Sequence, residues 1–267
     1  MRFLPLLACL SLSVSFASAQ AEKPGQKEAG EKKVERVVLE RGQKRTPLFM
    51  EWTVAADPTA PALLLLHAAR SSKGEYRPMV PRFQALGYHC LAIDLICGGE
   101  SRGVRNNTAK NARDGGRQAN YLDAVPDILD ALAWLEERVK GQVVLVGSSY
   151  SASLALQLAG EHRERIDGVI AFSPGEYFAS VGKGTTWIQD SAKAVTCPVL
   201  LLSARNEEGE WRAIFEALGS KDKTSFLPEG PGEHGAKALW EESAGHAEYW
   251  KAVEGFLARA FPVPAPR

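Results

Sequence analysis

The sequence carries no net charge, few cysteines and no hydrophobic run long enough to span a membrane. Lysine plus arginine and aspartate plus glutamate number 32 each, so no overall field favours nucleic acid or an anionic membrane. No C-x-x-C pair or histidine–cysteine cluster indicates a metal site. The sequence shows no internal repeat and no change of composition between its halves. For 267 residues, these absences leave one large domain as the expectation.

The N-terminal segment has the pattern of a secretory signal peptide. A short apolar stretch softened by serines follows Arg2 and ends in the small residues Ala-Ser-Ala at 17–19. This pattern predicts a signal peptide over residues 1–19, cleaved after about Ala19, and a secreted or periplasmic protein. The apolar core is too short and too rich in serine for a membrane-spanning helix. A lipid anchor on Cys9 is the alternative.

The remaining chain divides into a leader, one domain and a tail. Residues 20–33 are mostly lysine, glutamate and glycine and predict a flexible leader, because they have little to bury. Residues 262–267 are rich in proline and cannot continue a helix, so they form a short tail after the domain at 34–261. Three cysteines follow the signal peptide: Cys90, Cys97 and Cys197. An odd number cannot pair fully within one chain, and their redox state stays open.

Segments typical of strands and helices alternate through the domain. The expected strands are residues 34–40, 48–55, 62–66, 90–95, 143–146, 168–172, 199–202 and 224–227. The expected helices lie in the segment up to residue 86 and over residues 120–139, 152–158, 211–218 and 249–261. Several of the strands are wholly apolar, as central parallel strands are. The alternation predicts an α/β fold whose mostly parallel sheet is covered by helices on both faces.

The most informative segment is VVLVGSSYS at residues 143–151, which places a serine on a sharp turn after a buried strand. Gly147 permits a close backbone turn, and Ser149 lies where the chain reverses into an apolar helix. The segment matches the pattern G-x-S-x-G with Ser151 in place of the last glycine. Such a turn holds the serine hydroxyl over the end of the sheet, where it can act as a nucleophile. An ordinary small-residue turn into a helix is the alternative.

A serine nucleophile needs a base, and the base needs a group that orients it. Both are expected beyond the carboxyl ends of later strands. His234, in a glycine-rich loop after the last strand, is the predicted base, with His246 as the substitute. Glu207 follows the strand at 199–202 and is the predicted acid, with Glu208 as the alternative.

The oxygen of the attacked carbonyl also needs hydrogen-bond donors. One should be the backbone N–H of Tyr150, which follows the predicted nucleophile. The second should come from the loop after the strand at 62–66, with Ala69 as the first choice and Ala68 as the next.

Five motifs in this order resemble those of the α/β-hydrolase family, over about residues 48–261. They are LLLLHA at 63–68, DLICGGES at 94–101 (similar to D-x-x-G-x-G-x-S), GSSYS at 147–151, the acid after the strand at 199–202, and His234–Gly235. The resemblance implies an α/β-hydrolase fold and the order nucleophile Ser149, acid Glu207, base His234. It extends toward the dienelactone-hydrolase-like and serine-aminopeptidase-like branches, although the first uses cysteine where this chain has serine.

The sequence departs from the family pattern at three places. Ala68 replaces the usual glycine of the oxyanion loop, which narrows its backbone freedom. Ser151 replaces the second glycine of the serine turn. In the loop after Asp94, Cys97 shifts the glycine pattern by one place.

Two segments bear on the substrate. Residues 173–196, where many relatives insert a large lid, number only about two dozen and favour an open cleft over deep burial of long lipids. Within them, Tyr177 and Trp187 either line the cleft or pack a small cap onto the body. Residues 102–117 hold five basic side chains against the single acid Asp114 and form either a solvated loop or a region that favours an anionic substrate.

Together these patterns predict a secreted serine hydrolase that cleaves a carboxylic ester of small or moderate size through an acyl-enzyme on Ser149. The expected partner is a small-molecule ester, with no nucleic acid, no membrane span, no metal and no organic cofactor. Hydrolysis of a lactone, an amide or a peptide by the same residues is one alternative. A non-catalytic binding protein on the same scaffold is the other, because a fold does not determine a function. The oligomeric state stays open.

Overall fold

The computed structural model describes residue 1 and residues 34–42 and 45–263. The predicted signal peptide, the predicted leader and the last four residues of the predicted tail lie outside the described residues. The chain divides into two units, Met1–Lys32 and Lys33–Arg267, and every described helix and strand belongs to the second. In this described part, no helix is both long and apolar enough to cross a membrane.

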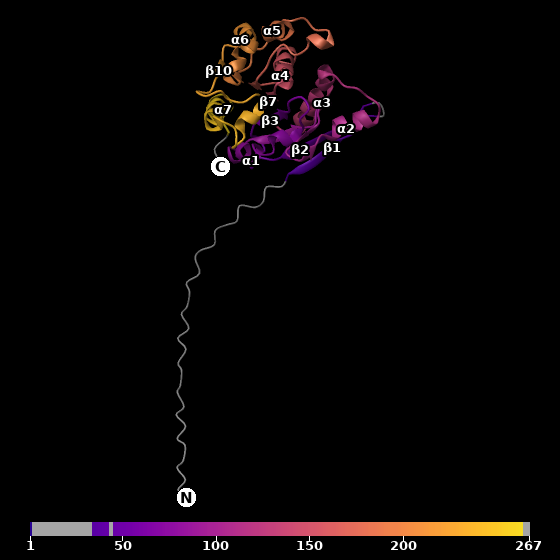
Figure 1. Cartoon of the computed structure of the whole chain (residues 1–267), viewed down its shortest axis with the longest axis vertical. Coiled ribbons are helices and arrows are strands. Elements are labelled where there is room, and N and C mark those ends of the chain that lie inside the picture. The colour runs from indigo at the N-terminus through magenta and orange to yellow at the C-terminus, as the bar shows by residue number, and fades with distance from the viewer. Residues whose placement is uncertain (2–33, 43–44, 264–267) are drawn as a thin grey trace. The chain divides into compact units, whose positions relative to one another are not determined.

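The second unit is built on one eight-stranded sheet (Figure 1). Its strands are β1 (Glu35–Leu39), β2 (Leu48–Thr53), β3 (Ala62–Leu66), β4 (His89–Ile93), β7 (Val143–Ser148), β8 (Gly168–Phe172), β9 (Val199–Leu202) and β10 (Lys223–Phe226). Their order across the sheet is β1-β2-β4-β3-β7-β8-β9-β10. β2 runs antiparallel to both of its neighbours, and the other pairs are parallel. Seven strands, all except β2, therefore run in the same direction, and their carboxyl ends lie along one edge of the sheet.

The central strands are apolar on both faces because both faces are buried. In β3 every residue is buried, and successive side chains point to opposite sides of the sheet. Leu63 and Leu65 join one hydrophobic cluster, and Leu64 and Leu66 join another. These two clusters are the cores above and below the sheet.

Helices cover each of these cores. The helices are α1 (Val80–Ala85), α2 (Asn107–Asp114), α3 (Val125–Glu136), α4 (Tyr150–Glu161), α5 (Trp187–Ala192), α6 (Glu208–Ala217) and α7 (His246–Ala260). α1 and α7 bury Phe83 and Trp250 on one face of the sheet. α3, α4 and α6 cover the other face, and α5 packs between α4 and α6 (Figure 1). The predicted α/β-hydrolase fold is thus confirmed.

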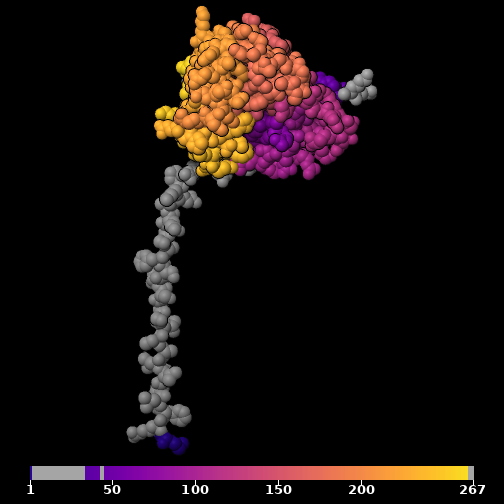
Figure 2. Space-filling model, turned by 45° about the horizontal axis from the view of Figure 1, so that its top comes forward, coloured from indigo at the N-terminus to yellow at the C-terminus, as the bar shows by residue number. Residues whose placement is uncertain are grey.

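Short 3₁₀ helices connect these elements, and a small hairpin interrupts one loop. The 3₁₀ helices are η1 (Lys73–Tyr76), η2 (Tyr121–Ala124), η3 (Ala179–Val181), η4 (Arg205–Glu207) and η5 (Ala236–Leu239). The hairpin is formed by β5 (Glu100–Ser101) and β6 (Val104–Arg105). Figure 2 shows one face of the molecule, on which the first half of the described chain (indigo and magenta) adjoins the second half (orange and yellow).

The structure differs from the expected elements at several positions, three of them in α2, α3 and α7. The basic segment at 102–117, expected as a loop, contains α2, whose N-terminus is capped by the Asn106 side chain accepting from the Ala109 N–H. The long helix expected at 120–139 is η2 followed by the shorter α3, since Pro126 is accommodated in the first turn of an α-helix. The last helix begins three residues earlier than expected, at His246.

The three described cysteines are all free thiols. Cys90 is fully buried in β4. The Cys97 thiol donates a hydrogen bond to the carbonyl oxygen of Asn120 at 2.6 Å, and burial raises its pKa to about 12.

Candidate active site

Ser149 lies on the turn between β7 and α4, in a backbone conformation that few residues other than glycine adopt. Its φ is 59° and its ψ is −125°. The turn is anchored to the next strand, since the Ser149 N–H donates to the carbonyl oxygen of Phe172 at 2.8 Å. Gly147 is required at this turn because a Cβ atom on it would lie 2.4 Å from Cα of Ala152. The helix therefore returns close over the strand and leaves Ser149 half-buried at the edge of the sheet.

Ser151, which stands where the family pattern has glycine, stabilises this turn through the hydrogen bonds of its hydroxyl group. Its hydroxyl oxygen accepts from the Ser148 N–H at 2.9 Å and lies 2.8 Å from the carbonyl oxygen of Leu66, to which it donates. All three residues are fully buried. The hydroxyl thus links the end of β3 to the end of β7 directly beneath Ser149.

His234 and Glu207 form a hydrogen-bonded pair. His234 Nδ1 lies 2.5 Å from Glu207 Oε1. Glu207 ends η4, directly after β9, and its Oε2 accepts from the Ser173 hydroxyl at 2.6 Å and from the Ala204 N–H at 3.2 Å. Partial burial disfavours the charged carboxylate, but the hydrogen bonds from His234 and Ser173 prevail and lower the pKa of Glu207. A charged Glu207 therefore holds the imidazole, with its Nδ1 proton directed at the carboxylate.

Two serines fix the loop that carries His234. The Gly235 N–H donates to the Ser173 hydroxyl at 2.9 Å, and the Ala236 N–H donates to the Ser148 hydroxyl at 2.9 Å. The loop thus lies against the residue that precedes Ser149, and Ser173 joins this loop to the acid. Sequence reasoning missed Ser148 and Ser173. The only signal for them was a small polar residue at the carboxyl end of each of two neighbouring apolar strands.

The structure distinguishes the predicted acid and base from the alternatives Glu208 and His246. The Glu208 carboxylate pairs with Arg212, one turn further along α6, and not with a histidine. His246 begins α7, and its buried Nδ1 has no hydrogen-bond partner among the described residues. Only Glu207 and His234 face each other.

The backbone donors are distinguished in the same way. Tyr150 is the first residue of α4, so its N–H has no acceptor within the helix. The Ala68 N–H already donates to the carboxylate of Glu75 at 2.9 Å. No hydrogen bond from the Ala69 N–H occurs within the described part of the chain. Ala69 and not Ala68 is therefore the free donor of this loop, and Glu75, which sequence reasoning missed, fixes the residue before it.

The buried His67 side chain stabilises the loop that carries Ala68 and Ala69. Its ring is fully buried, with Nε2 accepting from the Leu95 N–H at 2.9 Å and Nδ1 donating to the carbonyl oxygen of Ala68 at 2.7 Å. Burial lowers its pKa, so the ring is neutral. Beside it, the buried Lys73 ammonium pairs with Asp94 at 2.7 Å. His67 therefore has a packed, hydrogen-bonded role beneath this loop.

The two aromatic residues predicted to line the cleft, Tyr177 and Trp187, have different partners. The Tyr177 hydroxyl donates to the carbonyl oxygen of Ser173 at 2.9 Å, and the Ser149 side chain is close enough to influence its pKa. Burial raises the pKa of Tyr177 to about 12, so the hydroxyl stays protonated. Trp187 packs edge-on against Phe178, with the ring centroids 4.8 Å apart.

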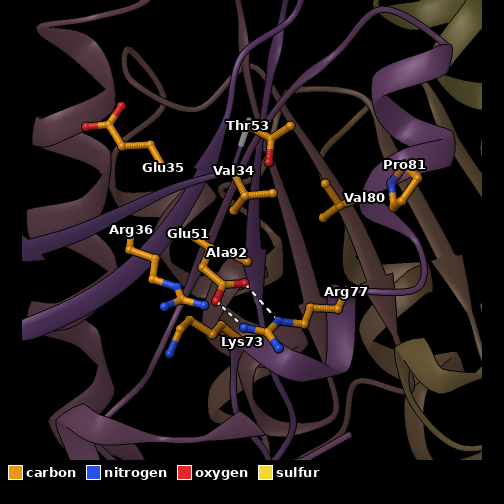
Figure 3. A pocket seen from close by; sticks show the side chains of 10 residues that line it. All are labelled: Val34, Glu35, Arg36, Glu51, Thr53, Lys73, Arg77, Val80, Pro81 and Ala92. Carbon is orange, nitrogen blue, oxygen red and sulfur yellow. Dashed lines mark hydrogen bonds and ion pairs between the residues drawn. The ribbon is translucent and has the colours of Figure 1, made fainter. Parts of the chain in front are cut away.

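A cavity of about 670 Å³ lies elsewhere, against β1, β2, η1 and α1. Figure 3 shows its side chains, among them Arg77, whose guanidinium forms two hydrogen bonds with Glu51. Of the residues at and around the candidate site, only Lys73 lines it, and Lys73 is engaged with Asp94. This cavity is therefore separate from the candidate site. No cluster of His, Cys, Asp and Glu that could hold a metal is found among the described residues.

Comparison with known proteins agrees with the fold. No curated protein matches the chain in sequence. Dienelactone hydrolase from Anabaena variabilis superposes with a TM-score of 0.65 at 16% identity, over 86% of this chain and 98% of that chain. The esterase Pf2001 from Pyrococcus furiosus gives 0.63 at 16% identity, over 86% and 93%. Monoacylglycerol lipase from Paleococcus ferrophilus gives 0.57 at 15% identity, over 85% and 99%.

The sequence itself matches a family model as well. The match covers residues 63–266, which include most of β3, the serine turn, Glu207 and His234. The chain belongs to the alpha/beta hydrolase family.

Proposed function

We propose that this protein is a serine hydrolase that cleaves carboxylic esters of small or moderate size through an acyl-enzyme on Ser149. The observation that carries the proposal is the Glu207–His234 pair, whose loop is hydrogen-bonded to Ser148 beside the strained turn of Ser149. A charged acid, an oriented imidazole and an adjacent serine are the parts that nucleophilic catalysis by serine needs.

In the proposed reaction, the Ser149 hydroxyl oxygen attacks the ester carbonyl while His234 Nε2 takes its proton. The Glu207 carboxylate stabilises the imidazolium that forms. The N–H groups of Tyr150 and Ala69 bind the negative oxygen of the tetrahedral intermediate. As the intermediate collapses, the bond to the alcohol breaks and His234 returns the proton to the leaving oxygen. Water, deprotonated by His234, then attacks the acyl-enzyme and releases the acid and Ser149.

Three further points support an ester substrate and an exported enzyme. Two of the similar structures are named as an esterase and a monoacylglycerol lipase, and a third as a dienelactone hydrolase. The segment between β8 and β9 holds only η3 and the short α5, which supports an open cleft and a small acyl group. The pattern at residues 1–19 leads us to propose export and cleavage after about Ala19.

The test is hydrolysis of a p-nitrophenyl ester series, from acetate to decanoate, by the mature protein and by Ser149→Ala. A covalent fluorophosphonate probe reports the serine independently of the substrate. Ser225→Ala, on the exposed edge strand β10, is the matched control. We expect turnover and labelling in the wild type and in the control, and neither in Ser149→Ala.

The outcomes separate the alternatives. Labelling at Ser149 without ester turnover would transfer the proposal to amides, peptides or lactones. Absence of both labelling and turnover would contradict a serine hydrolase and indicate a protein that only binds its ligand.

A further inference from the structure

A second cavity, of about 420 Å³, borders the loop that carries the proposed oxyanion donor. Ala69 lines it together with Cys97 and Tyr121. Tyr121 in turn stacks on the ring of Tyr150, with the centroids 4.4 Å apart. A carbonyl group held by the N–H groups of Ala69 and Tyr150 therefore lies at the edge of this cavity, and the rest of the substrate can extend into it.

The lining of this cavity is cationic. It contains Arg70, Arg113 and Arg117 and no acidic residue. Arg117 is compensated by Asp123 at 2.8 Å. Arg113 donates only to the neutral carbonyl oxygen of Gly98, at 3.0 Å. Among the described residues, no carboxylate pairs with Arg70 or Arg113, so two guanidinium groups beside the cavity lack an anion.

The backbones that carry these two arginines are fixed. The Arg70 N–H donates to the carbonyl oxygen of Cys97 at 3.2 Å, and its own carbonyl accepts from the Glu100 N–H at 3.2 Å. Arg113 lies in the last turn of α2, a helix capped at Asn106 and ended at Gly115. The remaining walls include the apolar Ala109 and Ala112. Uncompensated guanidinium groups over apolar walls, held on a rigid backbone, are suited to a short chain that ends in a carboxylate.

We propose that this cavity binds a free carboxylate of the substrate, so that the preferred ester carries a carboxylate in addition to the scissile bond. The assignment rests on the proposed function for the reaction at Ser149 but concerns a different set of side chains. Arginine favours carboxylates because its planar group donates two parallel hydrogen bonds. Because both arginines are exposed, the preference weakens as ionic strength rises.

The test compares monomethyl adipate with dimethyl adipate, which differ by one free carboxylate in the acyl part. A second pair, 4-acetoxybenzoate and its methyl ester, places the carboxylate in the alcohol part. The wild type is compared with Arg70→Gln/Arg113→Gln and with the control Arg105→Gln. Arg105 is an exposed arginine of β6 that does not line the cavity.

We expect the wild type to prefer the charged member of one pair by at least tenfold in kcat/KM. In the double variant this ratio should fall by about tenfold, mainly through a higher KM for the charged ester. Arg105→Gln should leave the ratio unchanged, which separates local binding from general attraction by positive charge. Binding of monomethyl adipate and of 4-acetoxybenzoate to Ser149→Ala, measured by calorimetry, tests the cavity without catalysis.

Two results would overturn this assignment. One is a wild type that hydrolyses the neutral esters but shows no preference in either pair, which leaves the proposed function standing. The other is failure of Ser149→Ala to bind either charged ester, or equal binding after both arginines are replaced. Binding by Ser149→Ala without any turnover by the wild type would instead support the cavity and contradict the proposed function.

Discussion

Two serines at the candidate site have a positive φ, which is rare for residues other than glycine. The φ of Ser149 is 59° and that of Ser173 is 51°. Such conformations typically raise the free energy of the folded state by about 1–3 kcal/mol each, and persist only where the surroundings enforce them. Hydrogen bonds enforce both, from the Ser149 N–H to Phe172 and from the Ser173 N–H to Leu202. The side chain at each position is retained at a cost in stability, which is typical of functional sites.

This strain can be measured by comparing Ser149→Gly with Ser149→Ala. Both variants lack the hydroxyl, so apart from the methyl group of alanine they differ in the freedom of the backbone. Relief of strain should outweigh the extra entropy of the unfolded glycine chain, and we expect Ser149→Gly to be more stable by about 1 kcal/mol. Urea unfolding of both variants measures the difference. Ala133→Gly, at an exposed position within α3, is the control and should show the ordinary loss of about 1 kcal/mol. A less stable Ser149→Gly would show that the turn is not strained.

The lowered pKa of Glu207 predicts how its contribution to stability depends on pH. Because the pKa is lower in the folded than in the unfolded protein, the ionised carboxylate stabilises the fold above its ordinary pKa. This contribution is lost as the pH falls through the lowered value. The difference in unfolding free energy between wild type and Glu207→Gln should therefore shrink from about pH 7 to about pH 3. A difference that is constant over this range would contradict an ionised Glu207.

Activity provides the second readout for the same variant. Glu207→Gln should lower kcat by about 10²–10⁴-fold, because the amide cannot stabilise the imidazolium. Glu208→Gln, which removes a charge one residue away but leaves His234 untouched, is the matched control and should retain activity.

At the scale of elements, the apolar strands were the best predicted part of the structure. β3, β8 and β9 have the bounds expected from the sequence, because a short, wholly apolar run is typical of a central strand that is buried on both faces. α2 was missed because its sequence is mostly polar, and only Thr108, Ala109 and Ala112 are buried. Its position against β2 is determined by long-range contacts that no local pattern records.

The residues of the candidate site also fall into a predicted group and a group that was missed. Ser149, Glu207 and His234 were predicted because each follows a strand at the same edge of the sheet. Ser173, Ser148 and Glu75 were not, since serines and glutamates are common and these ones matter only through partners far away in sequence. Ser173 reaches Gly235, 62 residues further on, and Ser148 reaches Ala236, 88 residues further on.

The junction of β3, β7 and α4 gives a prediction about Ser151. Restoration of the family residue, by Ser151→Gly, should destabilise the protein by about 1–3 kcal/mol, because the buried Ser148 N–H loses its acceptor. The carbonyl oxygen of Leu66 loses one donor but keeps the Tyr76 hydroxyl. Ser151→Ala should show a similar loss, which separates the hydroxyl from backbone freedom. Thermal or urea unfolding measures both. The control Ser180→Ala, on the exposed η3, should change stability by less than about 0.5 kcal/mol. Neutral behaviour of both Ser151 variants would show that the link is dispensable.

At the scale of the whole molecule, the last helix closes one of the two cores. α7 packs against β9, and Phe261, directly after it, is fully buried. A Cβ atom on Gly168 would lie 2.2 Å from the Phe261 ring, so this glycine provides the space that the ring fills. The Tyr88 hydroxyl donates to the carbonyl oxygen of Phe261 at 2.9 Å. The end of the described chain is therefore held between β8 and the start of β4.

Phe261→Ala should accordingly destabilise the whole domain, by about 3–5 kcal/mol, because it leaves a cavity in the core. Leu86→Ala, at a position 36% exposed near the same core, is the control and should cost less than about 1 kcal/mol. Denaturant unfolding monitored by tryptophan fluorescence and by circular dichroism would report the loss. Coincident transitions in both signals are expected if the two cores unfold together. A small effect would show that the helix is held mainly by its other contacts.

The order of the site along the chain has a consequence for synthesis. Ser149 and its turn precede Glu207 by 58 positions, and His234 comes still later in the sequence. On the proposed function, a nascent chain that has emerged only as far as β9 holds the nucleophile but not its base. Such a chain should therefore neither hydrolyse an ester nor react with a serine probe, even when its first strands have folded. Reaction with a fluorophosphonate would begin only when the loop after β10 has closed on Ser148 and Ser173. On the proposed function, the time at which the fluorophosphonate begins to label Ser149 would therefore report the completion of folding.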